Sequence, residues 1–212
     1  MITTTRAAIL SAALMTVAPA GAASRGAPVE QAASAADAQR ISAIREALLR
    51  LPYYGVFDFL TFSYDKGTVK LGGYAYQPSL IRDAERAVKR VSGVDAVVVE
   101  IKALPASLND DDIRWRVFYA IYTNDFLSKY AIGTGALWGH RHPYRSPMAG
   151  PFGAFPGMQP TGNYPIHIVV EGGRVRLLGL VDNEADKTVA GLATRGVSGT
   201  FGVENELVVE KQ

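Results

Sequence analysis

The sequence contains no cysteine among its 212 residues. A chain without cysteine cannot form a disulfide framework, and it lacks the lipid-attachment cysteine that a bacterial lipoprotein carries just after its signal segment. Cysteine-based catalysis is excluded for the same reason.

The common catalytic motifs are also missing. The sequence has no Gly-x-Ser-x-Gly, no His-Glu-x-x-His and no phosphate loop ending in Gly-Lys-Ser or Gly-Lys-Thr. Its glycine pairs, Gly72-Gly73 and Gly172-Gly173, fall at the ends and turns of expected strands, where they indicate backbone geometry. We therefore predict a noncatalytic protein that uses no cofactor.

The chain also lacks a large excess of positive or negative charge, because its formal net charge is only +2. Binding to nucleic acid through phosphate attraction needs a strongly basic chain or patch. We therefore predict no nucleic-acid partner.

No apolar run is long enough for a membrane-spanning helix, which needs about 20 residues. The longest run near the N-terminus, 7–17, follows Arg6 and precedes small residues at Ala18, Ala20 and Ala22. This pattern predicts a cleavable signal peptide over 1–22, and hence a periplasmic or secreted protein. The alternative is an uncleaved helix that anchors the chain to the inner membrane. Residues 23–37, rich in Ala and with few large apolar residues, are predicted to be a disordered linker.

An internal duplication organises the rest of the chain. Residues 67–101 match residues 173–207 without a gap, and the shift is constant because 173 − 67 and 207 − 101 are both 106. The matched positions are mainly apolar residues and glycines, such as Val69 with Val175 and Gly73 with Gly179. A repeat of this kind indicates two copies of one structural unit.

Hydrophobic periodicity predicts the order helix, strand, strand, helix, strand in each copy. The fold class is therefore α+β, with a first unit over 38–104 and a second over 109–212. The second unit carries an insertion over 131–164 that is rich in Gly, Pro and aromatic residues. In the first unit we expect a helix at 38–51, strands at 56–64 and 68–74, a helix at 79–91 and a strand at 94–101. In the second we expect a helix from 109 to about 127, strands at 165–170 and 174–180, a helix at 185–194 and a strand at 203–210.

The glycine and valine pattern of each copy resembles that of the BON domain. In the first copy the pattern is Gly67-x-Val69-x-Leu71-x-Gly73 followed by Val91-Ser92-Gly93, and the second copy has Gly173-x-Val175-x-Leu177-x-Gly179 followed by Val197-Ser198-Gly199. The first copy departs from the pattern at Val99, where the second copy has the typical Asn205. The second copy departs from it at Thr200, where Val is usual, and the insertion is not part of the pattern. The resemblance implies an exported tandem protein that binds phospholipid membrane surfaces. We take six glycines as fold-defining: Gly67, Gly73, Gly93, Gly173, Gly179 and Gly199.

Two regions are candidates for a peripheral membrane contact. The insertion places aromatic rings beside arginines, a combination that suits a lipid headgroup interface; its candidate residues are Trp138, Arg141, Tyr144, Arg145, Phe152 and Phe155. The other candidate is the face of the helix at 79–91 that carries Arg82, Arg86 and Arg90, spaced four apart. The alternative for the insertion is a surface loop without a partner, and the alternative for the helix is the ordinary charged face of a helix that covers a sheet.

The three histidines and one acidic run do not form the pattern of a metal site. His140 and His142 supply only two ligands, His167 has no evident carboxylate partner, and Asp110–Asp112 suit the start of a helix better than a calcium loop. No metal is predicted. Besides a membrane surface, the open alternatives for a partner are envelope proteins, bound in a chaperone-like manner or within a scaffold.

Overall fold

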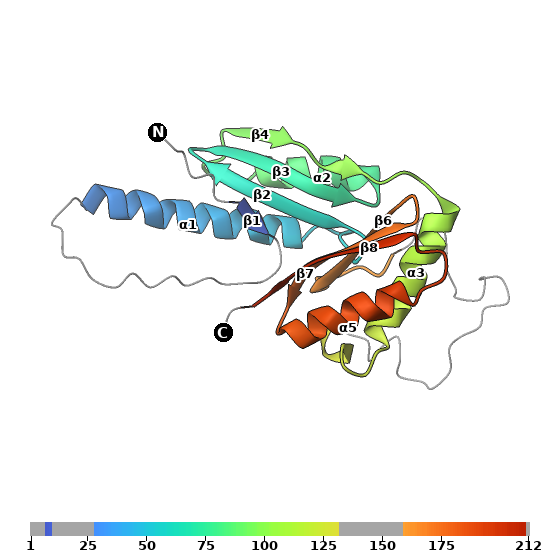
Figure 1. The fold of residues 1–212 in the computed structure, drawn as a ribbon. Coiled ribbons are helices and arrows are strands. Elements are labelled where there is room, and N and C mark those ends of the chain that lie inside the picture. Colours follow the sequence, from blue (N-terminus) through green and yellow to red (C-terminus); the bar gives the residue numbers. More distant parts are fainter. Residues whose placement is uncertain (1–6, 10–27, 132–158, 211–212) are drawn as a thin grey trace.

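The computed structural model describes residues 7–9, 28–131 and 159–210, which form two α+β units (Figure 1). The first unit contains helix α1 (Pro28–Leu49), strands β2 (Phe59–Asp65) and β3 (Thr68–Ala75), helix α2 (Pro78–Lys89), and strands β4 (Ala96–Val99) and β5 (Lys102–Ala103). Strand β1 (Ala7–Ile9) joins the same sheet, whose order is β1-β2-β3-β4, with β5 also paired to β3. The predicted order of elements is therefore present.

The second unit repeats this arrangement. It contains helix α3 (Leu108–Tyr122), a short 3-10 helix η1 (Ser128–Tyr130), strands β6 (Ile166–Glu171) and β7 (Arg174–Val181), helix α5 (Glu184–Arg195) and strand β8 (Gly202–Val209). Its sheet has the order β6-β7-β8. The parallel pairs start at Thr68↔Ala96 in the first unit and at Arg174↔Gly202 in the second. Both members of the second pair lie 106 positions after those of the first, so the sequence repeat is also a repeat of strand register.

The N-terminal helix corrects the predicted linker over 23–37. Helix α1 begins at Pro28, about ten residues before the expected start, and its first part replaces most of that linker. Proline fits the first turn of a helix, and the alanines that follow are the strongest helix formers. Asp37, which precedes the expected helix, lies inside the helix and pairs with Arg40 at 2.8 Å.

Residues 7–9 belong to the predicted signal peptide, yet they pair as β1 with β2 in the full chain. The register is antiparallel, with Ala7 opposite Ser63 and Ile9 opposite Thr61. None of the helices in the described part of the chain combines the length and apolarity needed to cross a membrane.

All six glycines that the sequence indicates as fold-defining have positive φ. Two of them show why a side chain is excluded. A Cβ at Gly73 would lie 2.0 Å from the carbonyl oxygen of Phe59, and one at Gly179 would lie 2.0 Å from that of Pro165. These contacts are equivalent in the two copies, and each lets β3 or β7 approach its antiparallel neighbour closely.

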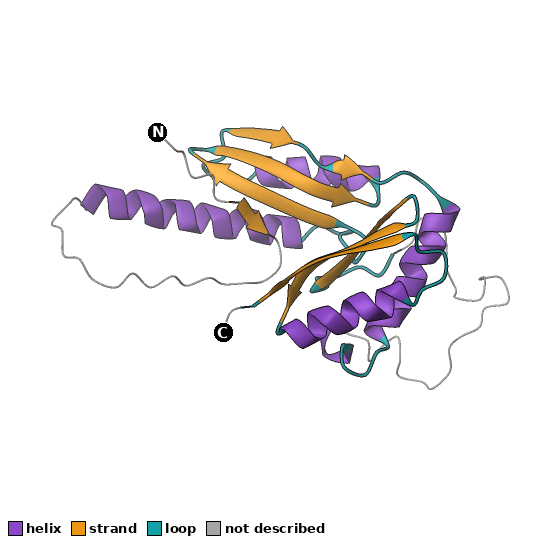
Figure 2. Ribbon diagram, viewed as in Figure 1, coloured by secondary structure: helices purple, strands orange, loops and turns teal. Residues whose placement is uncertain are grey.

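Each unit buries one face of its sheet beneath two helices (Figure 2). Helices α1 and α2 cover the first sheet, and helices α3 and α5 cover the second. The opposite faces of the two sheets meet in a smaller apolar cluster made of Phe59, Leu104, Val169 and Leu178, with Tyr74 against it.

The two cores are not independent. Val56 and Phe57 precede β2 of the first unit, but both are fully buried in the core of the second. The amide of Ile168 donates to the carbonyl of Val56 at 2.8 Å, and the Phe57 ring lies edge-on to Trp115. The strand expected from Val56 therefore begins only at Phe59, because the preceding residues pair with and pack into the second unit.

Candidate functional site

One end of the second unit gathers exposed apolar side chains, and we call it the tip. It consists of Leu108, Leu192 and Phe201 together with the exposed arginines Arg174 and Arg195. The exposed fractions are 81% for Phe201, 73% for Leu108 and 59% for Leu192. Leu108 begins α3, Leu192 lies in the last turn of α5, and Phe201 ends the loop between α5 and β8. The start of α3, the end of α5 and this loop lie toward the same end of the unit (Figure 1).

Asp110 connects the start of α3 to the turn between β6 and β7, next to Leu108 and Arg174 in the sequence. Ser107 caps α3 by accepting a hydrogen bond from the Asp110 amide, and the Asp110 carboxylate accepts from the amides of Gly172 (2.9 Å) and Gly173 (2.8 Å). The acidic run that the sequence places at the start of a helix thus also holds the turn between β6 and β7. The start of this helix and the hairpin turn are thereby fixed to each other.

The same turn also holds Phe201. The Phe201 amide donates to the carbonyl of Gly173 at 2.8 Å, and the phenyl ring occupies the space where a Cβ at residue 173 would be, 2.4 Å away. Beside it, Arg116 donates to the carbonyl of Ser198 at 3.2 Å. The backbone of Phe201 is therefore held at this turn, while its side chain is 81% exposed.

The first unit shows that an aromatic ring is not needed here for folding. Asp95 is the repeat counterpart of Phe201, and its amide makes the equivalent bond to the carbonyl of Gly67 at 2.7 Å. The fold therefore accepts a charged residue at this position. The Phe201 ring is 81% exposed and has no role in the core, and its location at the same end of the unit as Leu108 and Leu192 makes the three side chains a candidate contact surface.

The predicted basic face lies on α2, in the first unit. Arg82, Arg86 and Arg90 are all exposed. Arg86 pairs with Asp83, and the neighbouring Lys89 pairs with Glu85 at 2.6 Å, so acidic residues offset part of this charge. Arg82 and Arg90 enter no ion pair among the described residues.

The predicted insertion residues, Trp138, Arg141, Tyr144, Arg145, Phe152 and Phe155, lie outside the described residues, as do His140 and His142. The end of the insertion is described and is anchored to the first unit. Gln159 bonds to Asp58 at 2.5 Å and to the carbonyl of Tyr53 at 3.1 Å, and the Pro160 carbonyl accepts from the Val56 amide at 3.1 Å.

A buried polar cluster lies between the units and was not predicted from the sequence. Asp58 is fully buried and accepts hydrogen bonds from the amides of Tyr76 (2.7 Å) and Gly55 (3.1 Å) and from Gln159. Burial raises the pKa of Asp58 to about 6, an effect that these donors and the nearby Arg114 partly oppose. Arg114 itself is fully buried, where it pairs with Asp111 and lies 5.0 Å from the centre of the Tyr76 ring.

His167 is the second ionisable group of this boundary. It is 2% exposed, and its Nε2 lies 3.3 Å from the Tyr54 hydroxyl. Burial lowers the pKa of His167 to about 4, and the carbonyls of Asp58 and Gly55 oppose the shift. The imidazole is therefore neutral at pH 7. Within the described ranges, no group of three His, Asp or Glu side chains is placed to hold a metal ion.

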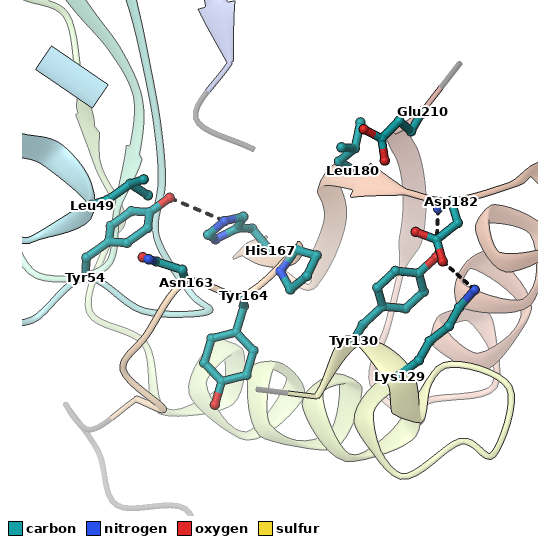
Figure 3. Close-up of a pocket in the computed structure, with 11 residues that line it drawn as sticks. Leu49, Tyr54, Lys129, Tyr130, Asn163, Tyr164, His167, Leu180, Asp182 and Glu210 are labelled. Atoms are coloured by element: carbon teal, nitrogen blue, oxygen red, sulfur yellow. Dashed lines mark hydrogen bonds and ion pairs between the residues drawn. The ribbon is translucent and has the colours of Figure 1, made fainter. Parts of the chain in front are cut away.

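A cavity of about 330 Å³ opens beside this histidine (Figure 3). Tyr54 and Leu49 line it from the first unit, whereas Tyr164, Tyr130 and Lys129 line it from the second. Lys129 pairs with Asp182 at 2.6 Å at the opposite side of the cavity from the Tyr54–His167 pair. Two pairs of lining residues, Tyr54 with His167 and Lys129 with Asp182, are thus engaged with each other.

The comparisons with known proteins identify the family. The model of the BON domain matches residues 36–105 and 157–211. The chain belongs to the BON domain family. This agrees with the resemblance seen in the sequence and with the two α-β-β-α-β units. BON domains are in general noncatalytic binding domains of the bacterial envelope, many of them periplasmic, and the family is associated with membrane phospholipids.

Curated proteins gave no match to the sequence. Among solved structures, the chain is similar to CdsD, a structural protein of the Type III secretion system of Chlamydia trachomatis, at 13% identity, with 81% of this chain and 92% of that chain covered and a TM-score of 0.26. A structure of the C-terminal domain of CdsD matches at 12% identity, covering 81% of this chain and 97% of that one, with a TM-score of 0.25. Neither likeness is close enough to support a functional argument.

The tip residues were missed in the sequence, although one signal of them was available. The repeat aligns Phe201 with Asp95, and an aromatic residue at an exposed turn where the other copy has a carboxylate stands out in that alignment. Leu108 and Leu192 had no comparable signal, because only the packing of α3 and α5 decides which of their residues stay exposed.

Proposed function

We propose that this BON protein binds the phospholipid surface of an envelope membrane peripherally and without catalysis, in envelope maintenance or stress tolerance. The tip carries this proposal. Phe201, Leu108 and Leu192 would enter the headgroup region, and Arg174 and Arg195 would contact lipid phosphates. The proposed setting is the periplasm, or the exterior if the protein is secreted, reached through a cleavable signal peptide over 1–22.

The magnitudes favour the apolar groups as the main contribution. Removing a Phe or Leu side chain from water contributes about 1.5–3 kcal/mol, whereas an arginine near an anionic surface contributes about 1 kcal/mol. Partial insertion of the three apolar side chains would therefore outweigh the two arginines. Binding should prefer anionic lipid, and this preference should weaken with salt while the apolar contribution persists.

The basic face of α2 and the insertion remain proposed contributors. Arg82, Arg86 and Arg90 would add electrostatic attraction, and the insertion residues Trp138, Arg141, Tyr144, Arg145, Phe152 and Phe155 would add aromatic anchors. A deletion that tests the insertion should span 132–158 only, because Gln159 and the buried Tyr164 belong to the folded part of the chain.

Co-sedimentation with vesicles of neutral or anionic phospholipid tests the proposal. Phe201→Asp, which installs the residue of the first unit, should reduce the bound fraction severalfold. Phe126→Asp is the matched control, because Phe126 is 74% exposed but lies beyond the C-terminal end of α3, away from the tip. Equal binding by wild type and Phe201→Asp would reject the tip. Failure of the wild type to bind either vesicle would favour the alternative, a chaperone-like or scaffold protein that binds envelope proteins.

A further inference from the structure

The outer edge of β2 is the feature that the proposed function leaves unexplained. Strand β3 pairs with β2 along its whole length, from Phe59↔Tyr74 to Asp65↔Thr68. On the other side, among the residues that the structure describes, only Ala7–Ile9 pair with it, opposite Thr61–Ser63. This edge therefore accepts an extended backbone in the antiparallel direction.

The chemistry of the edge leaves it open to pairing. Natural sheets protect free edges with charged side chains, proline, bulges or very short strands. The stretch Thr61–Ser63 has none of these side chains, and β2 is seven residues long. By contrast, β4 has four residues, and β8 carries Glu204 and Glu206. The outer side of β6 already meets Val56 through the amide of Ile168.

The segment that occupies this edge lies within the predicted signal peptide. Cleavage after about residue 22 would remove β1 and expose the backbone N–H and C=O groups of β2. We propose that signal removal converts the β2 edge into a docking site for an extended peptide segment of another exported protein. The segment would pair antiparallel with Thr61–Ser63 and carry small apolar residues, as Ala7-Ala8-Ile9 does. This inference rests on the predicted export and cleavage, and it does not depend on membrane binding.

The size of the edge favours a peptide over a second copy of the chain. A stable dimer generally buries about 1,200–2,000 Å² in total, far more than a three-residue backbone pairing provides. A short peptide needs only the hydrogen bonds of the edge and room for alternate side chains. Binding of this kind is weak and exchanges rapidly, which suits transient contact with a client segment.

Amide hydrogen exchange tests the proposal. In the full chain the edge-facing amides within Thr61–Ser63 should be protected, and in the chain that begins at Ala23 they should exchange at least about tenfold faster. A synthetic peptide of residues 4–12, TTRAAILSA, should restore protection to the shorter chain. The same peptide with both Ala7 and Ala8 replaced by proline should not, because proline removes backbone donors.

Variants of the edge complete the test. Thr61→Lys combined with Ser63→Lys should abolish the effect of the peptide, whereas Thr68→Lys, an exposed position on β3, should leave it unchanged. Equal exchange in the full and shortened chains would overturn the proposal, as would protection at β4 or β8 in place of β2. If the shortened chain forms a dimer in which the amides of Thr61–Ser63 are protected without peptide, the partner at this edge would be a second copy of the chain, and the peptide proposal would be overturned. If one of these results is found while the protein still binds vesicles, the docking proposal fails and the proposed membrane binding stands.

Discussion

Asp58 and His167 are buried at the boundary between the units, and their pKa values move in opposite directions. Burial raises that of Asp58 to about 6, above the ordinary 3.8, and lowers that of His167 to about 4, below the ordinary 6.5. The contribution of Asp58 to stability is therefore full below pH 3.8 and is lost as the pH rises through 6. The contribution of His167 is full above pH 6.5 and is lost as the pH falls through 4.

We predict that single substitutions separate these two effects. Two pKa units correspond to about 3 kcal/mol. Asp58→Asn should gain stability relative to wild type by up to about 3 kcal/mol between pH 4 and pH 7, and His167→Gln should gain a similar amount between pH 7 and pH 4. Urea unfolding of the three proteins at pH 4, 5, 6 and 7 measures both slopes. The same slope for both variants would contradict the opposite shifts.

Asp110 joins one element to another, since it lies in the first turn of α3 and holds the turn between β6 and β7. Both of its carboxylate oxygens accept backbone amides, and the residue is 2% exposed. Loss of hydrogen bonds to a charged acceptor costs about 1.5–3 kcal/mol each. Asp110→Ala removes two such bonds and should therefore lower the free energy of unfolding by about 3–6 kcal/mol.

Asp110→Asn tests the cause of that loss. It keeps one acceptor oxygen, so its effect should be smaller than that of Asp110→Ala. Asp112→Ala is the control, because Asp112 pairs with Arg116 at the surface and should cost under about 1 kcal/mol. Chemical denaturation of the three variants measures the series. Similar losses for Asp110→Ala and Asp112→Ala would show that the turn is held in another way.

At the scale of elements, the repeat made the fold predictable. Val69 and Val175 occupy the same position in β3 and β7. The hairpin predicted in one unit therefore predicts the hairpin of the other, and also the parallel pairing that follows it. The start of α1 was missed because the alanine-rich composition before Asp37 suits a disordered linker and a helix equally. The true start of β2 depends on Phe57, whose burial in the other unit is a tertiary contact without a local pattern in the sequence.

The candidate site was less predictable than the fold for a related reason. Exposure of Phe201 and burial of Asp58 follow from how elements meet, and neither residue type reveals its environment alone. The basic face of α2 could be found from its four-residue spacing, because a helix places such residues on one side. The tip combines the start of α3 with the end of α5 and the loop after it, and α3 lies far from the other two in the sequence.

For the molecule as a whole, we predict one cooperative unfolding transition. The sheets share the cluster around Phe59 and Val169, and Val56 and Phe57 of the first unit complete the core of the second. Phe57→Ala should lower stability by about 3–5 kcal/mol, as expected for a buried aromatic ring. Leu71 and Leu177 are equivalent residues of the two units. Within each protein, wild type or variant, their methyl NMR signals should vanish together at one temperature, which is lower for the variant. Separate melting of the two signals would contradict a shared core.

Membrane contact through the tip is the central claim, and the absence of cysteine allows a direct test. A single cysteine can be placed at Phe201→Cys or, as the control, at Phe126→Cys and labelled with an environment-sensitive fluorophore. On anionic vesicles with brominated acyl chains, the account predicts strong quenching at residue 201 and almost none at residue 126. Vesicle binding without quenching at residue 201, or with stronger quenching at residue 126, would contradict it.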